Sequence, residues 1–98
     1  MTVVRHVIFR GRVQGVGFRV FVEDAAVRRR IEGWVRNRRE GSVEAVFAGP
    51  ADTVEAVIVA CRTGTSVARV EAVEQRDGTA DDLALRGDRD GFAVLPTV

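Results

Sequence analysis

A glycine-rich stretch joins two segments of different periodicity, and it limits the folds that this chain can adopt. The apolar run Val7–Phe9 before the stretch is typical of a strand, and residues 18–30 after it have the spacing of a helix. The stretch itself, Gly11–Arg19, has the sequence Gly-Arg-Val-Gln-Gly-Val-Gly-Phe-Arg. Because glycine adopts positive φ without strain, Gly15 and Gly17 allow successive backbone N–H groups to converge on one point. The pattern therefore predicts a tight strand–turn–helix unit.

This predicted turn has the features of a small anion site. The start of a helix presents unpaired N–H groups and the positive end of the helix dipole, which both favour a bound anion. Arg19 lies in the first helical turn and offers a planar fork of donors suited to a phosphate or a carboxylate. The stretch lacks the Lys-Ser/Thr ending of a Walker loop, and Val20 replaces the third glycine of a dinucleotide fingerprint. On its own, a glycine-rich turn is also compatible with a simple tight connection between elements.

The composition is that of a soluble globular protein. Apolar residues make up 46% of the 98 residues and charged residues 30%, which argues against disorder and predicts one domain spanning residues 1–98. The single cysteine, Cys61, excludes an internal disulfide and is typical of a reducing compartment. The first apolar runs are interrupted by Arg5-His6 and Arg10, so neither export nor a membrane span is predicted. We expect a cytoplasmic protein that does not bind membranes.

The charge is unevenly distributed along the chain. Residues 1–49 contain ten arginines and five acidic residues, whereas residues 50–98 contain five arginines and nine acidic residues, so the halves carry +5 and −4. A basic half attracts small anions. The clusters Arg28–Arg30 and Arg36–Arg39 also raise the alternative of nucleic-acid binding. The isoelectric point near 8.0 and the lack of an aromatic-interleaved basic motif argue against that alternative.

The order of periodic segments predicts an α+β fold. Strands are expected at about 3–11, 33–38, 42–48, 67–75 and 92–95, and helices at 18–30 and from Pro50 to Gly64. The strand at 67–75 has Val70 and Val73 out of alternation, which indicates a bulge. Residues 77–91 are rich in Asp and Gly and are expected to form a loop with a short strand at 83–85. Gly49 is the expected N-cap of the second helix and Pro50 its first residue.

With right-handed crossovers this order gives a ferredoxin-like split βαβ sandwich, βαββαβ with a short additional C-terminal strand. Its sheet is rich in antiparallel pairs and carries both helices on one face. We expect the first and third strands to be parallel neighbours at the centre of the sheet. The predicted anion site then lies at the C-terminal end of the first strand, where the second strand can bring a further residue.

Two reactive residue types have structural interpretations. His6, the only histidine, is on the predicted face opposite Val7 and Phe9 and has no Ser, Cys or acidic motif beside it. We interpret it as a sheet-face histidine and not as a general base. Val54, Val57, Ile58 and Cys61 recur at helical spacing, so Cys61 is predicted to be a core residue.

Asn37, at the end of the second predicted strand, is the candidate partner of Arg19. A carboxamide offers a donor and an acceptor, so it can hold a water molecule and align one of its lone pairs. That water can attack a phosphoryl group clamped by Arg19 in line with the leaving group. The alternative for Asn37 is a β-bulge or an exposed polar position.

Two long motifs resemble those of the acylphosphatase family. Gly11–Arg19 is similar to its first signature, and Gly33-Trp34-Val35-Arg36-Asn37 with Gly41–Glu44 is similar to its second. The weaker matches Gly64-x-x-x-Ala68-x-Val70 and Phe92-x-Val94 extend the resemblance over nearly the whole chain. The chain departs from the family pattern at Arg30, where glycine is usual, at Thr65, where proline is usual, and in its C-terminal residues Leu95–Val98.

The resemblance implies a ferredoxin-like fold and the hydrolysis of small acyl phosphates to carboxylate and phosphate, without metal or cofactor. By position, it implies that Arg19 binds the phosphoryl group and that Asn37 orients the attacking water. It assigns substrate binding to residues Gln14, Gly15, Val16, Gly17, Phe18 and Arg19. Phosphate or sulfate is expected to occupy the same site, and the domain is expected to act as a monomer.

Three alternatives remain at this point. The first is a non-catalytic module on the same fold that senses a phosphorylated metabolite, because a fold alone does not determine function. The second is a domain that processes acyl phosphates for a larger maturation enzyme. The third is RNA binding, which salt-sensitive association at physiological ionic strength would reveal. The physiological acyl group, whether acetyl, carbamoyl or glyceroyl, is left open.

Overall fold

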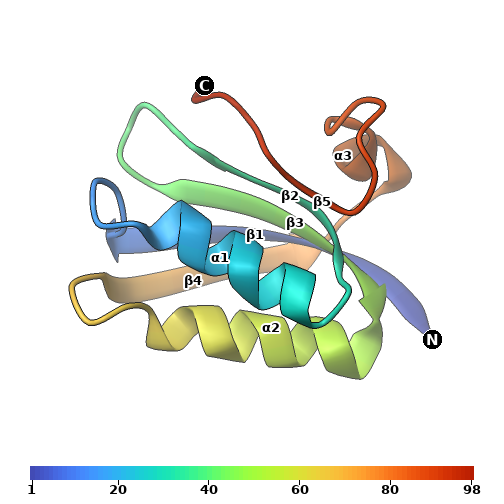
Figure 1. Cartoon of the computed structure of the whole chain (residues 1–98), viewed down its shortest axis with the longest axis horizontal. Coiled ribbons are helices and arrows are strands. Elements are labelled where there is room, and N and C mark those ends of the chain that lie inside the picture. The colour runs from blue at the N-terminus through green and yellow to red at the C-terminus, as the bar shows by residue number, and fades with distance from the viewer.

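A five-stranded sheet with two long helices on one face forms the protein, in a computed structural model that describes residues 1–98 (Figure 1). The strands occur in the order β4-β1-β3-β2-β5. None of the helices has the length and hydropathy that a membrane span requires. The elements in chain order are β1 (Thr2–Arg12), α1 (Phe18–Arg28), β2 (Glu32–Asn37), β3 (Val43–Pro50), α2 (Ala51–Thr63), β4 (Arg69–Asp77), α3 (Ala80–Ala84) and β5 (Phe92–Val94).

The predicted ferredoxin-like architecture is confirmed, but the direction of one strand pair is not. β1 lies between β3 and β4 and is antiparallel to both, whereas we expected it to be parallel to β3. The reason is the β2–β3 hairpin, whose strands are antiparallel. A helical crossover returns the chain parallel to β1 in β2, so the inserted β3 must run against both. The only parallel pair joins β2 to the short β5.

The main core lies between the sheet and the two long helices. Along β1, Val7 and Phe9 are completely buried, and α1 contributes Phe18 and Val22 to the same cluster. The stripe predicted on α2 is buried as well, and Cys61 is inaccessible to solvent. Burial raises the pKa of the Cys61 thiol to about 12. The prediction that Cys61 is a core residue is therefore confirmed.

The irregularity predicted in the fourth strand lies where β4 passes Gly11. Arg10 pairs with Ala72 and Gly11 with Val70, so Glu71 has no partner on β1. Gly11 has a φ of 125°, and a Cβ atom at this position would lie 2.2 Å from the carbonyl oxygen of Arg69. This close approach requires glycine, and it bends the strand pair next to the loop that leads into α1.

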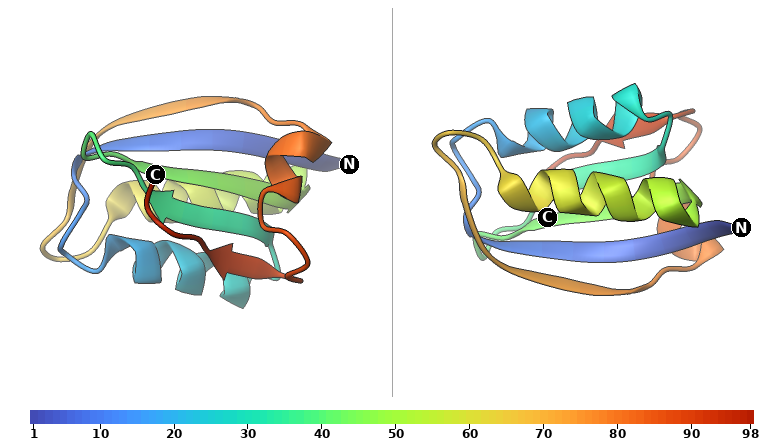
Figure 2. Two further views of the ribbon diagram at one scale, coloured as in Figure 1. Left: turned by 90° about the horizontal axis from the view of Figure 1, so that it is seen from above. Right: turned by 90° about the horizontal axis from the view of Figure 1, so that it is seen from below.

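A short helix, α3, occupies part of the segment that we expected to be a loop with a strand at 83–85. Thr79 caps it in a capping box, in which its side chain accepts from the N–H of Asp82 and the Asp82 carboxylate accepts from the N–H of Thr79. Figure 2 shows α3 and α2 on opposite sides of the sheet. On the face of the sheet away from α2, α3 covers Trp34, whose Nε1 donates to the carbonyl oxygen of Asp82 at 2.7 Å. Leu83 packs against a second, smaller apolar cluster, the Trp34 cluster, which is formed by Trp34, Val46, Ala93 and Leu95.

The two long helices differ in the backbone conformation of their caps. α2 is capped by Pro50 at its N-terminus, one residue later than the predicted Gly49, and ends at Gly64 with a φ of 73° as predicted. α1 ends at Arg28, two residues before the end predicted from the sequence; Arg29 is its C-cap, and Arg30 follows in the left-handed region with a φ of 56°. The N–H groups of Arg30 and Ile31 donate to the carbonyl oxygens of Val27 and Ala26 at 3.1 and 2.9 Å. This is the bonding of a Schellman cap, which glycine forms with less strain.

Replacement of Arg30 by glycine is therefore expected to stabilise the protein. A left-handed residue with a Cβ atom costs about 1–2 kcal/mol, and the extra freedom of glycine in the unfolded chain offsets part of the gain. We expect about 1 kcal/mol more in the free energy of unfolding and a rise in Tm of about 4–8 °C. Arg30→Ala is the matched control, because it removes the side chain but keeps the Cβ atom. Equal stabilisation by Ala and Gly in thermal denaturation would contradict backbone strain as the cause.

Candidate active site

The loop between β1 and α1 presents a run of unused backbone donors. Gly15 and Gly17 have φ of 72° and 76°, and Gly17 caps α1 without a side-chain hydrogen bond. The first bond into the helix runs from the N–H of Phe21 to the carbonyl oxygen of Gly17 at 3.1 Å. The N–H groups of residues 14–20 donate to no acceptor in the protein. Oriented donors at the N-terminus of a helix are suited to bind an anion.

Arg19, in the first turn of α1, is a half-buried cation without an internal partner. Its guanidinium forms no hydrogen bond or ion pair, in contrast to Arg10 and Arg36, which are each held by glutamates. An arginine whose charge is not neutralised within the fold keeps its full donor fork for a ligand.

Asn37 is the last residue of β2. Its backbone is hydrogen-bonded, whereas its side-chain oxygen is unpaired. Asn37 is paired with Val43 of β3, and its carbonyl oxygen accepts from the N–H of Val98 at 3.2 Å. Its Oδ1 atom is buried and has no hydrogen-bond partner. A buried acceptor without a partner costs free energy, so folding alone does not account for it.

Arg19 and Asn37 line one pocket of about 130 Å³ at this end of the sheet. The structure therefore brings together the two residues that the sequence assigned to catalysis. Of the residues assigned to substrate binding, Gly15, Gly17, Phe18 and Arg19 contribute to the lining, whereas Gln14 and Val16 do not. The sequence analysis did not assign Val13 or Val20, which also line the pocket. The lining residues are Val13, Gly15, Gly17, Phe18, Arg19, Val20 and Asn37.

The side chain of Gln14 connects the loop to the β2–β3 hairpin. Its Nε2 donates to the carbonyl oxygens of Arg38 and Ser42 at 2.7 and 2.8 Å. Both acceptors lie in the turn that directly follows Asn37. Gln14 therefore holds the end of β2 against the loop, while its backbone N–H remains within the run of unused donors.

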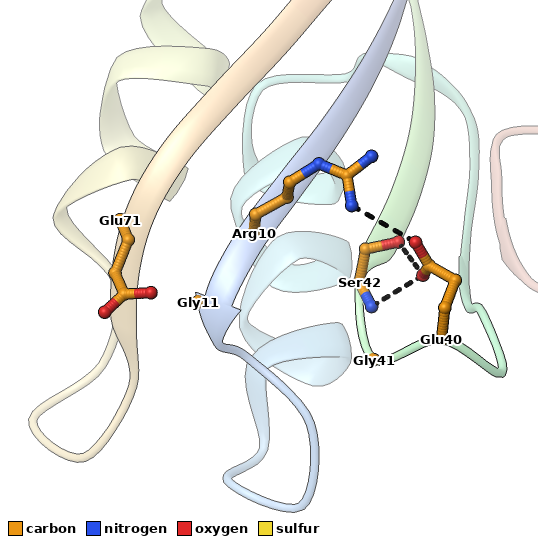
Figure 3. Close-up of a pocket in the computed structure, with 6 residues that line it drawn as sticks. All are labelled: Arg10, Gly11, Glu40, Gly41, Ser42 and Glu71. Atoms are coloured by element: carbon orange, nitrogen blue, oxygen red, sulfur yellow. Dashed lines mark hydrogen bonds and ion pairs between the residues drawn. The ribbon is translucent and has the colours of Figure 1, made fainter.

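A larger pocket of about 260 Å³ lies beside β1 and is shown in Figure 3. Arg10 in this pocket donates to Glu40 at 3.1 Å and to Glu74 at 2.7 Å, so its charge is already neutralised. Hydrogen bonds from the side chain and backbone of Ser42 hold the pKa of Glu40 at about 2. Glu71 also faces the pocket in Figure 3. Since two carboxylates line this pocket and its one arginine is already paired, the smaller pocket is the better anion site despite its size.

His6 lies on the face of the sheet opposite the long helices, as predicted. Its Nε2 is 2.7 Å from Oε2 of Glu44, and Nε of Arg36 donates to the other carboxylate oxygen at 2.7 Å. Burial raises the pKa of Glu44, but the hydrogen bonds from His6 and Arg36 outweigh burial and hold that pKa below its ordinary value. His6 is thus engaged in a charged cluster and does not line the 130 Å³ pocket.

Comparisons with known proteins agree with this geometry. The family model named Acylphosphatase matches residues 5–94. An acylphosphatase of Rhodopseudomonas palustris (strain BisB18) is 54% identical over 97 residues, covering 99% of this chain and 98% of that protein. An acylphosphatase of Azorhizobium caulinodans is 52% identical over 98 residues, covering all of both chains.

The likeness extends to a solved structure. The crystal structure of acylphosphatase from Bacillus subtilis has a TM-score of 0.83 to this chain at 30% identity. The match covers 97% of this chain and 99% of that one. The family and the activity predicted from the sequence are confirmed: the chain belongs to the acylphosphatase family, whose members hydrolyse acyl phosphates.

Proposed function

We propose that the pocket of Arg19 and Asn37 binds the phosphoryl group of a small acyl phosphate and directs one water molecule at phosphorus. The observation that carries this mechanism is that an arginine without a partner and a buried unpaired amide oxygen line the same pocket. The unused N–H groups of residues 14–20 form its third component. Each of these groups lacks a partner within the fold and is complementary to one part of the reacting complex.

The phosphoryl oxygens are bound by the backbone donors and by Arg19. The N–H groups at the start of α1 and the helix dipole stabilise negative charge there without reorganisation during the reaction. The guanidinium fork binds two phosphoryl oxygens at once. Gln14 contributes by fixing the hairpin next to this loop, so that Asn37 stays at its distance from the bound group.

Asn37 orients the nucleophile. Its Oδ1 accepts a hydrogen bond from the water, which leaves a lone pair of the water oxygen directed at phosphorus. The new bond joins the water oxygen to phosphorus, and the bond between phosphorus and the acyl oxygen breaks with its electron pair leaving on the carboxylate. The products are a carboxylate and inorganic phosphate, and the proton of the water passes to phosphate or solvent. Since carboxyl pKa values lie near 4, the leaving group needs no general acid.

The chemistry requires neither a covalent intermediate nor a metal ion. No Ser, Cys, His or carboxylate side chain lines the pocket. Arg19 and the backbone donors supply the positive potential that a cation provides in other phosphoryl-transfer sites. The carboxylate leaving group makes the substrate intrinsically reactive, so positioning and electrostatics provide most of the acceleration.

Incubation of the purified protein with acetyl phosphate tests this function. We expect acetyl phosphate to disappear with stoichiometric release of inorganic phosphate, at a rate that EDTA does not change. Loss of activity with EDTA would contradict the metal-free reaction. Binding of phosphate without any turnover of acetyl phosphate would instead support a non-catalytic phosphate-sensing module.

We also propose that residues 1–98 act as a single, monomeric domain in the cytoplasm. One chain supplies every residue that lines the pocket. The only cysteine is a buried thiol, which is compatible with a reducing compartment.

A further inference from the structure

The mechanism described above uses the backbone N–H of Val20 but gives no role to its side chain. Val13 and Phe18 are each 1% exposed and form the buried floor, whereas Val20 is 66% exposed. Val20 therefore lies at the rim and is the only solvent-exposed apolar side chain of the lining. An exposed valine in a helix gains little from burial within the fold, and valine has a lower helix propensity than alanine or arginine.

In-line attack by a water held at Asn37 is expected to direct the leaving group toward the rim of the pocket. Asn37 enters the pocket from the end of β2, and Val20 enters from the first turn of α1, next to Arg19. In-line displacement places the leaving group on the side of phosphorus away from the attacking water. The acyl group thus points away from Asn37 and out of a pocket whose floor is filled.

The rim contains no second charge for the acyl group. Arg19 is the only ionisable side chain of the lining, and the phosphoryl group uses it. A carboxylate within the acyl group would meet no cation in the lining, whereas an apolar acyl group would meet the methyl groups of Val20.

We propose that Val20 is a specificity-determining residue that contacts the acyl group and favours acyl phosphates with apolar acyl groups. This inference rests on the proposed function, since it assumes that the backbone donors and Arg19 bind the phosphoryl group. It predicts that benzoyl phosphate, whose ring extends past the carbonyl carbon, gains more from Val20 than acetyl phosphate does.

The first experiment compares Val20→Ala with Val27→Ala. Val27 is 56% exposed and lies on the same helix, seven residues after Val20. It is therefore on the same face of the helix, about 10 Å from Val20. Val20→Ala should lower the ratio of kcat/KM for benzoyl phosphate to that for acetyl phosphate by about 3- to 10-fold, because contact with two methyl groups is lost. Val27→Ala should leave this ratio unchanged. Both variants should fold, since alanine favours an exposed helix position.

The second experiment adds a charge at the same two positions. Val20→Arg should raise kcat/KM for succinyl phosphate relative to acetyl phosphate by about 3- to 10-fold at low ionic strength. Added salt should diminish the gain, because an exposed charge pair is screened. Val27→Arg, which has the same net charge, should not change the ratio.

The outcomes separate this inference from the function on which it rests. If the unmodified protein hydrolyses neither acetyl nor benzoyl phosphate, the proposed function itself is wrong. If it hydrolyses both but Val20→Ala lowers both rates equally, or Val20→Arg and Val27→Arg act alike, only the role of Val20 is overturned.

Discussion

Replacement of Arg19 by lysine should lower kcat/KM for acetyl phosphate by about 100-fold or more, nearly as much as replacement by alanine. An ammonium group is a point charge and cannot reproduce the two parallel hydrogen bonds of a guanidinium to two phosphoryl oxygens. Steady-state kinetics with acetyl phosphate, together with the inhibition constant of inorganic phosphate, measure the effect. The value of kcat/KM should fall and the inhibition constant of phosphate should rise, because Arg19 contacts the phosphoryl group in the ground state and in the transition state.

The control for this prediction is Arg62→Lys. Arg62 is an exposed arginine in the last turn of α2, and like Arg19 it forms no ion pair or side-chain hydrogen bond. Its replacement should leave kcat/KM unchanged. Since Arg19 has no partner within the protein, its variants should also keep the thermal stability of the unmodified chain. Substantial activity in Arg19→Lys would show that positive charge alone suffices and would contradict bidentate binding.

Asn37→Ala should lower kcat by about 100-fold while the inhibition constant of inorganic phosphate changes by no more than about threefold. The amide is proposed to hold the water, which contributes to the transition state, whereas the N–H groups and Arg19 hold the phosphate. Removal of a buried acceptor without a partner also removes a desolvation cost, so the variant should unfold no more easily.

Asn37→Asp serves as the comparison variant for this position. Its carboxylate has nearly the same shape as the amide but repels a phosphate dianion, so both kcat and phosphate binding should suffer. If Asn37→Ala instead weakened phosphate binding as much as it lowered kcat, Asn37 would be a phosphate-binding group. Another residue would then have to orient the water.

Features of the fold were predictable where they depend only on the residues of one short segment. The positive φ of Gly15 and Gly17, the stripe of α2 and the burial of Cys61 follow from residue type and spacing alone. Spacing alone also allowed a β-bulge or an exposed polar position for Asn37, so the pairing of the two motifs came from the family resemblance.

Features that depend on competition between segments were predicted less well. Residues 77–91 have the composition of a loop, yet α3 forms because a capping box starts it and Leu83 packs on the Trp34 cluster. The Thr79–Asp82 spacing was present in the sequence, but the burial that favours a helix there comes from a strand more than forty residues away. The antiparallel β1–β3 pair likewise follows from the hairpin between β2 and β3 and not from β1 or β3 alone.

Residue type and spacing were enough to predict a run of backbone donors and an arginine at the start of the first helix, because glycine φ and helix geometry are local properties. Three further features required the folded arrangement: Asn37 lines the same pocket with an unpaired oxygen, Gln14 holds the hairpin against the loop, and Val20 forms the rim. These three features depend on the distance between β2 and α1. That distance is set by the packing of the core, and several segments of the chain contribute residues to this core. No single segment therefore contains enough information to predict it.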